Sequence, residues 1–231
     1  MQRGKLVWVG LYAVAMAYVE SAAVVYLRRV FGIVDLLRDA PPWDPAISPV
    51  ELGRELATLI MLLAVGWAVG RTWQSRLGFA CFAFGVWDVC YYLWLRLFIG
   101  WPDSLLAPDL LFLIPLPWWG PVIAPVLIAC LSAVGGALAV FLDDQGCTVR
   151  PGPWQGTALG LGGLAVLYAF MADALAALPA SAEALGRLRP GPFRWPPYLV
   201  GLVLMTGSVL GATLFRRRGD GGKKRPPSPV P

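Results

Sequence analysis

Histidine is absent from this sequence. Its absence excludes zinc sites of the HExxH type, Ser-His-Asp triads, His-ligated haem and the histidine boxes of di-iron desaturases. Lysine is also missing between Lys5 and Lys223, so no lysine can form a retinal-type Schiff base within the central part of the chain. We therefore expect no cofactor and no metal site; the alternative that these absences leave open is a hard cation such as Mg²⁺ or Ca²⁺ held by carboxylates alone.

Charge and cysteine are also scarce. Only 14% of the residues are charged, whereas a soluble domain carries about 25%. The four cysteines are too few and too scattered to form a disulfide framework. Abundant apolar residues take the place of charge: 58% of the chain is hydrophobic, and at least five apolar runs approach the ~20 residues that span a bilayer. This composition is typical of a multi-span membrane protein.

The apolar runs predict an all-α integral membrane protein with a bundle of six transmembrane helices in one domain, residues 1–215. We expect the spans at residues 6–27, 52–70, 77–99, 121–142, 157–178 and 197–215. A signal peptide is the alternative interpretation of the first run. The run continues to Tyr26 before it meets Arg28 and Arg29, however, which favours an uncleaved span.

The C-terminal tail, residues 216–231, is rich in proline and basic residues, and we expect it to be disordered. Six spans place both termini on one side of the membrane. Lysine and arginine are more frequent in the termini and loops of that side than in the other three loops, which favours a cytoplasmic location for both termini. The net charge of +5 thus reflects topology, and we expect no nucleic-acid partner.

The stretch Ser48-Pro49-Val50-Glu51 predicts the start of the second helix. Ser48 can cap it, proline suits the first helical position, and Glu51 can complete a capping box. From that start, the residues Glu51, Arg54, Glu55 and Thr58 follow one face of the helix. We expect this polar face to point away from the lipid.

The connector between the third and fourth spans, residues 100–120, is rich in tryptophan and proline. Its apolar part, 110–118, is too short to cross a bilayer, and Pro115 and Pro117 disfavour a continuous helix. We therefore expect an interfacial or re-entrant segment, which membranes tolerate where it is buried against protein.

Ionisable residues gather at the end of the bundle where this connector lies. Asp88 falls near the middle of the third span, and Glu20 lies ~10 Å from the outer end of the first, for a helix rise of ~1.5 Å per residue. Charges at such depth are costly unless paired or hydrated, so they mark a functional site. Our candidate ligand-binding residues, in a polar pocket open to the outer face, are Glu20, Arg54, Glu55, Asp88, Tyr91, Tyr92, Arg96, Asp103 and Asp109.

Two pairings across the first two spans fit these positions: Glu20 with Arg54, or Glu55 with Arg28. The spacing of Asp88, Tyr92 and Arg96 places them on one face of the third span. Asp173, near the end of the fifth span, is expected to pair with an arginine in the following loop.

Several glycines predict close helix packing. The GxxxG pairs are Gly156/Gly160 and Gly207/Gly211, and Gly135-Gly136 fits the same role. The run GTALGLGG from Gly156 has no preceding strand and no lysine, so it does not indicate a phosphate-binding loop.

Three segments, YVESAAVVYLRR, ELGRELATLIML and WDVCYYLWLRLFIGWPDSLLAPDLLFLIPLPWWGP, resemble those of a set of bacterial polytopic membrane proteins with no assigned function. The resemblance covers about residues 1–125. It implies a bacterial inner-membrane protein and lends no catalytic residue.

Three functions are compatible with these features. The first is binding of a small molecule or a lipid in the pocket, including as a transport component. The second is a membrane enzyme acting on a lipid-phase substrate, with Asp88 or Glu20 as general acid or base. The third is a structural or assembly subunit that meets a partner subunit or its own copies through helix–helix contacts. The one-sided polar cluster under a proline-rich connector favours the first.

Overall fold

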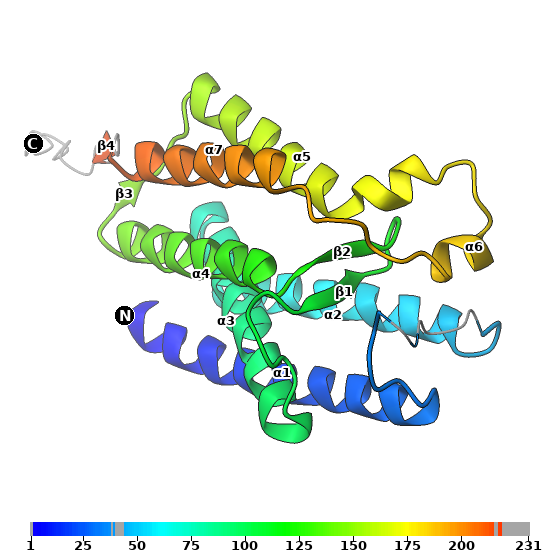
Figure 1. The fold of residues 1–231 in the computed structure, drawn as a ribbon. Coiled ribbons are helices and arrows are strands. Elements are labelled where there is room, and N and C mark those ends of the chain that lie inside the picture. The colour runs from blue at the N-terminus through cyan, green and yellow to red at the C-terminus, as the bar shows by residue number, and fades with distance from the viewer. Residues whose placement is uncertain (1, 38, 40–43, 215–216, 219–231) are drawn as a thin grey trace, which may run out of the picture.

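The computed structural model describes residues 2–37, 39, 44–214 and 217–218. Six long helices dominate it: α1 (Gln2–Val30), α2 (Ser48–Val69), α3 (Trp73–Ile99), α4 (Ile123–Asp144), α5 (Pro153–Ala176) and α7 (Trp195–Leu214) (Figure 1). A short helix, α6 (Ala182–Gly186), lies between α5 and α7. All six long helices are long and apolar enough to cross a membrane. The prediction of a multi-pass helical membrane protein is confirmed at this level.

The outer surfaces of the helices are strongly apolar. Large hydrophobic side chains such as Trp8, Ile60, Leu161 and Val203 are more than half exposed. Soluble proteins rarely leave so many large apolar side chains in water. The hydrocarbon of a bilayer accounts for this exposure, because apolar side chains lose nothing there by facing outward.

Small residues bring the helices together in two groups. In the first, α3 packs against α1, α2 and, most extensively, α4. A Cβ atom added to Gly78 of α3 would lie 2.9 Å from the carbonyl oxygen of Gly136 in α4, so these backbones touch. In the second group α5 packs along α7, where a Cβ on Gly162 would lie 2.8 Å from the carbonyl oxygen of Gly201.

The GxxxG prediction is therefore wrong in its residues. Gly156, Gly160 and Gly207 have nothing within 4 Å of an added Cβ, and Gly211 meets only the Gln155 side chain. The close contact uses Gly162 and Gly201 instead. The GxxxG spacing identifies a helix face that is smooth enough for close packing. It does not determine which face of the helix the neighbouring helix packs against. For the Gly135-Gly136 pair, the prediction of close packing is confirmed most clearly at Gly136.

The expected capping box at the start of α2 is not formed. The Ser48 hydroxyl accepts a hydrogen bond from the Asp44 backbone N–H at 3.1 Å, outside the helix. Glu51 turns inward to Arg54. Proline does occupy the first turn, as predicted. A capping box exists elsewhere, at the start of α3, where Thr72 and Ser75 exchange side-chain to backbone bonds.

The connector between α3 and α4 contains a β-hairpin, which the pattern of the sequence did not predict. Strand β1 (Pro108–Phe112) pairs antiparallel with β2 (Trp118–Pro121), with a register shift between Leu110 and Phe112. Aromatic residues suit strands, and Pro115 and Pro117 lie in the turn, where they remove no ladder donor. The predicted bundle of helices is present, and the hairpin is an addition to it.

A second strand pair joins two distant segments. Strand β3 (Cys147–Thr148), between α4 and α5, pairs with β4 (Arg217–Arg218), just after α7. Residues 217–218 of the predicted disordered tail thus form a strand, while 216 and 219–231 lie outside the described residues. Figure 1 shows these strands at the end of the bundle where the N-terminus lies, opposite the hairpin and α6.

The hairpin packs against two larger hydrophobic cores. One core joins α1, α2, α3 and α4, and Phe112 of β1 packs against it. The other joins α4, α5 and α7, and Leu111 and Trp118 of the hairpin pack against that one. Gly120 allows this second contact, because an added Cβ would lie 2.7 Å from the Phe170 ring. The alternating side chains of a strand make such two-sided packing possible.

Candidate functional site

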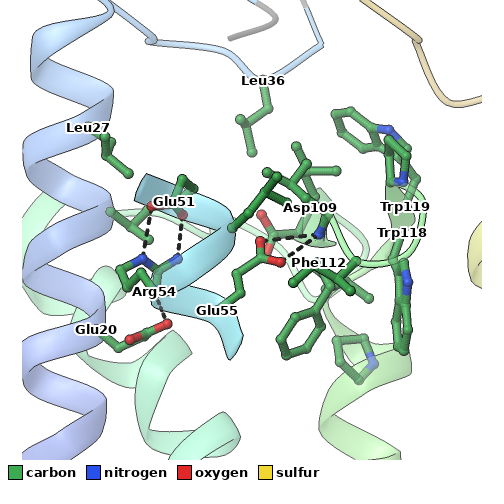
Figure 2. Close-up of a pocket in the computed structure, with 18 of the residues that line it drawn as sticks. Glu20, Leu27, Leu36, Glu51, Arg54, Glu55, Asp109, Phe112, Trp118 and Trp119 are labelled. Atoms are coloured by element: carbon green, nitrogen blue, oxygen red, sulfur yellow. Dashed lines mark hydrogen bonds and ion pairs between the residues drawn. The ribbon is translucent and has the colours of Figure 1, made fainter. Parts of the chain in front are cut away.

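A cavity of about 550 Å³ lies between α1, α2, α3 and the hairpin. This volume is within the range of ligand pockets, roughly 300–1,000 Å³. Figure 2 shows Glu20 and Arg54 on one side of the cavity and Asp109, Phe112, Trp118 and Trp119 on the other. Most of its wall is apolar or aromatic, with contributions from α6 and the start of α4 as well.

The structure brings seven of the nine candidate residues to this cavity: Glu20, Arg54, Glu55, Asp88, Tyr91, Tyr92 and Asp109. The other two lie outside it. The guanidinium group of Arg96 donates to the carbonyl oxygens of Gly100 and Pro102, the second at 2.9 Å, so it closes the end of α3. Asp103 is exposed in the following turn. Helical spacing predicts that Arg96 lies near Tyr92. The long side chain of Arg96 instead turns to the carbonyl oxygens that follow the end of α3.

An ion-pair network joins α1 to α2 on one side of the cavity. Arg54 lies between two carboxylates, Glu20 of α1 and Glu51 of its own helix (Figure 2). The Thr58 hydroxyl donates a further hydrogen bond to Glu20 at 3.1 Å. Of the two pairings considered from the sequence, the structure has Glu20 with Arg54. Since α1 and α2 make little direct contact, these polar bonds join them at this end, and the hydrogen bond from Lys5 Nζ to the Val69 carbonyl oxygen, at 2.8 Å, joins them at the other.

Glu55 ties the hairpin to α2. Its two carboxylate oxygens accept the backbone N–H of Leu113 at 3.1 and 2.9 Å. The residue is buried, with 6% of its surface exposed, and Leu113 follows β1 directly. A carboxylate is a strong acceptor for a backbone donor, so this contact fixes the edge of the cavity that the hairpin forms.

Replacing Glu55 by alanine should therefore loosen the hairpin. The Leu113 N–H would lose its acceptor at a cost of about 1–2 kcal/mol, and we expect faster hydrogen exchange at Leu113 and its neighbours. Glu55→Gln is the matched control, because its amide oxygen can still accept the bond. Equal exchange in both variants would contradict the role assigned to this contact.

Asp109 is the most buried acid of the cavity, with 3% of its surface exposed. The Tyr92 hydroxyl donates to it at 3.0 Å, and the Arg28 guanidinium lies 3.9 Å away. Burial raises the pKa of Asp109 above its ordinary value, and Arg28 and the Tyr92 hydroxyl each offset part of that shift. Arg28 also stacks over the Trp101 ring at 4.2 Å, so its charge is held in place.

Asp88 has no comparable partners. It lines the cavity with 7% of its surface exposed, and its Oδ2 atom accepts no hydrogen bond from the described residues. Three buried indole N–H groups of the cavity wall, those of Trp87, Trp118 and Trp119, likewise lack an acceptor there. Buried polar atoms normally have partners. Because four such atoms belong to residues of one cavity wall, this cavity is the candidate site of the described part of the chain.

The sequence did not identify all of this wall. It places Arg28 and Glu51 at this end of the bundle, but neither is among the candidate residues. Phe112 and Trp118 come from the unpredicted hairpin, and Phe170 reaches the cavity from α5. Tryptophan next to an intramembrane acid, as at 87–88, is the one available signal for the aromatic wall.

Two further observations limit the chemistry of the site. The described residues include no group of three or more His, Cys, Asp or Glu side chains that could hold a metal ion. Asp173 lies away from the cavity and pairs as predicted with a loop arginine: its carboxylate is 3.5 Å from Arg194 and accepts the Gly191 N–H at 2.8 Å.

Comparison with known proteins supplies no further guide. No protein-family model, no curated protein and no solved structure matches the chain. The function must therefore be inferred from the geometry of the cavity.

Proposed function

We propose that this membrane protein binds an amphipathic small molecule or a lipid in the cavity between α1, α2, α3 and the hairpin. The observation that carries the proposal is the pairing of a largely apolar cavity with four buried polar atoms that have neither a hydrogen-bond partner nor an ion-pair partner among the described residues. The wall offers apolar area for a chain or ring. Asp88 and three tryptophans, Trp87, Trp118 and Trp119, bring unpaired polar atoms to the same wall, and we propose that a polar end pairs with them.

The chemistry of the wall supports binding more strongly than catalysis. Small-molecule sites are mainly apolar, with a few placed polar groups that orient the ligand. Most ionised groups here are already held: Glu20 and Glu51 by Arg54, and Glu55 by the Leu113 N–H. Groups held in this way stiffen the wall and are poorly placed to exchange protons with a substrate.

A variant that fills the cavity tests the proposal. Leu52 lines the cavity, whereas Leu56, one turn further along α2, is 52% exposed. In maltoside micelles we would measure the thermal unfolding midpoint with octanol, octanoate or octylammonium added. Saturating ligand at about 100 times its dissociation constant stabilises a protein by about 2.7 kcal/mol, or about 5 °C and more at this chain length.

We expect at least one of the three amphiphiles to raise the midpoint of the wild type and of Leu56→Trp, but not that of Leu52→Trp. The Leu56 variant carries the same added volume on the outer surface, and it controls for partition into the micelle. Equal shifts in all three proteins would show that the amphiphiles act outside the cavity, and no shift in any would count against ligand binding.

A further inference from the structure

We infer that the ligand carries a positively charged ammonium group, and that this group lies against Asp88. The inference rests on the proposed function and specifies the chemistry of its ligand. The balance of charge in the wall favours a cation. Two guanidinium groups line the cavity, those of Arg28 and Arg54, together with five carboxylates, those of Glu20, Glu51, Glu55, Asp88 and Asp109.

Both arginines are already engaged. Arg54 pairs with Glu20 and Glu51, and Arg28 lies between Asp109 and the Trp101 ring. An anionic head group would have to compete with these carboxylates for either guanidinium group. An anionic ligand would also meet the surplus of carboxylates. The wall therefore disfavours a negatively charged head group.

Asp88 favours a cation independently of that balance. It is more than nine-tenths buried at the cavity wall, and its Oδ2 atom has no partner in the described part of the chain. Unlike Glu20 and Asp109, which pair with Arg54 and Arg28, Asp88 has no cationic partner of its own among these residues. An ammonium group would supply Asp88 with both the missing donor and the missing charge, and a charge-assisted bond of this kind is among the stronger ones. The three indole N–H groups need an acceptor and would have to pair with another part of the ligand or with water.

The aromatic side chains around Asp88 suit the same group. Trp87 and Tyr91 stack with ring centres 6.2 Å apart, and Tyr91 meets Tyr92 edge to face at 5.1 Å. All three line the cavity. The faces of such rings attract ammonium ions, and more so where water is excluded. A divalent metal ion fits less well, since the described acids form no metal-binding group.

Two sources could supply such a ligand: a free alkyl amine, or a lipid with an ammonium head group. Both share the ammonium group and an apolar chain. The two sources can be compared by the thermal unfolding midpoint of the wild-type protein in maltoside micelles, because maltoside contains no amine. The probes are octylammonium, octanoate and octanol as the first set, phosphatidylethanolamine and phosphatidylglycerol as the second, and calcium chloride as the ion alone.

We expect octylammonium to bind about tenfold or more tightly than octanoate and octanol, as a charge-assisted contact predicts. Asp88→Asn should lose most of this preference and Asp88→Glu should keep part of it. Asp103→Asn, which removes an exposed acid from the connector that follows α3, should leave the preference unchanged. A rise in the thermal unfolding midpoint with phosphatidylethanolamine, and not with phosphatidylglycerol, would assign the lipid as the source. A rise with octylammonium alone would assign the free amine.

The contrary results are distinct. Equal binding of all three octyl amphiphiles in the wild type would overturn the ammonium assignment and leave the cavity as a general amphiphile site. Tighter binding of octanoate or phosphatidylglycerol, or stabilisation by calcium alone, would overturn it as well. Binding of no probe would overturn the proposed function itself. The wild-type series decides among these outcomes even if the Asp88 variants fail to fold.

Discussion

Replacing Arg54 by methionine should destabilise the protein by about 3–5 kcal/mol, the cost of breaking a buried ion pair by removing one partner. Arg54 is the only cation that pairs with Glu20 and Glu51 among the described residues. Without it, the two carboxylates would face each other near the membrane interior, and Thr58 would remain the sole donor to Glu20. Because these bonds join α1 to α2 at this end of the bundle, the two helices should separate there.

Equilibrium unfolding in mixed micelles would measure this loss. Arg29→Met is the matched control, since Arg29 of α1 carries the same charge at the same end of the bundle as Arg54 but is exposed; its effect should stay below about 0.5 kcal/mol. The double variant Glu20→Gln/Arg54→Met should recover part of the loss, because it leaves fewer unpaired charges. A double variant no more stable than Arg54→Met would show that the unpaired Glu20 carboxylate is not the cause.

Replacing Gly162 by leucine should also be strongly destabilising, by about 3 kcal/mol, the upper part of the range for overpacked sites. Its first side-chain atom would lie 2.8 Å from the carbonyl oxygen of Gly201 and 2.9 Å from the Met205 side chain. Backbone atoms cannot rotate away as a side chain can. The variant must therefore push α5 and α7 apart along their shared face.

Gly160→Leu, two residues earlier in α5, gives the contrast. An added Cβ there meets nothing within 4 Å, and leucine has a higher helix propensity than glycine by up to about 1 kcal/mol. We expect it to be neutral or slightly stabilising. The GxxxG pattern predicts the opposite order of effects, so thermal unfolding of the two variants decides between spacing and structure. Similar losses in both would indicate that the Gly160 face is also packed, for example in an oligomer.

The sequence by itself determined the class of this protein and the positions of its helices. Six apolar runs near the length of a bilayer, broken by charged and proline-rich loops, can satisfy their backbone groups only as helices. The polar face of α2 and the buried position of Asp88 were also predictable, since a charge within an apolar helix must turn toward protein or water. These conclusions depend on residues close together in the chain.

Only the tertiary structure decided which residues meet. Helical spacing grouped Arg96 with Tyr92, yet Arg96 closes its own helix end. It also named the wrong glycines in α5 and α7, because a pattern along one helix does not say which face the next helix approaches. The hairpin escaped prediction because strand pairing forms between segments, and its position depends on Glu55, 58 residues before Leu113. Residues of that hairpin form one wall of the cavity. A sequence pattern within a single segment could not predict the cavity, because its walls come from segments far apart in the chain.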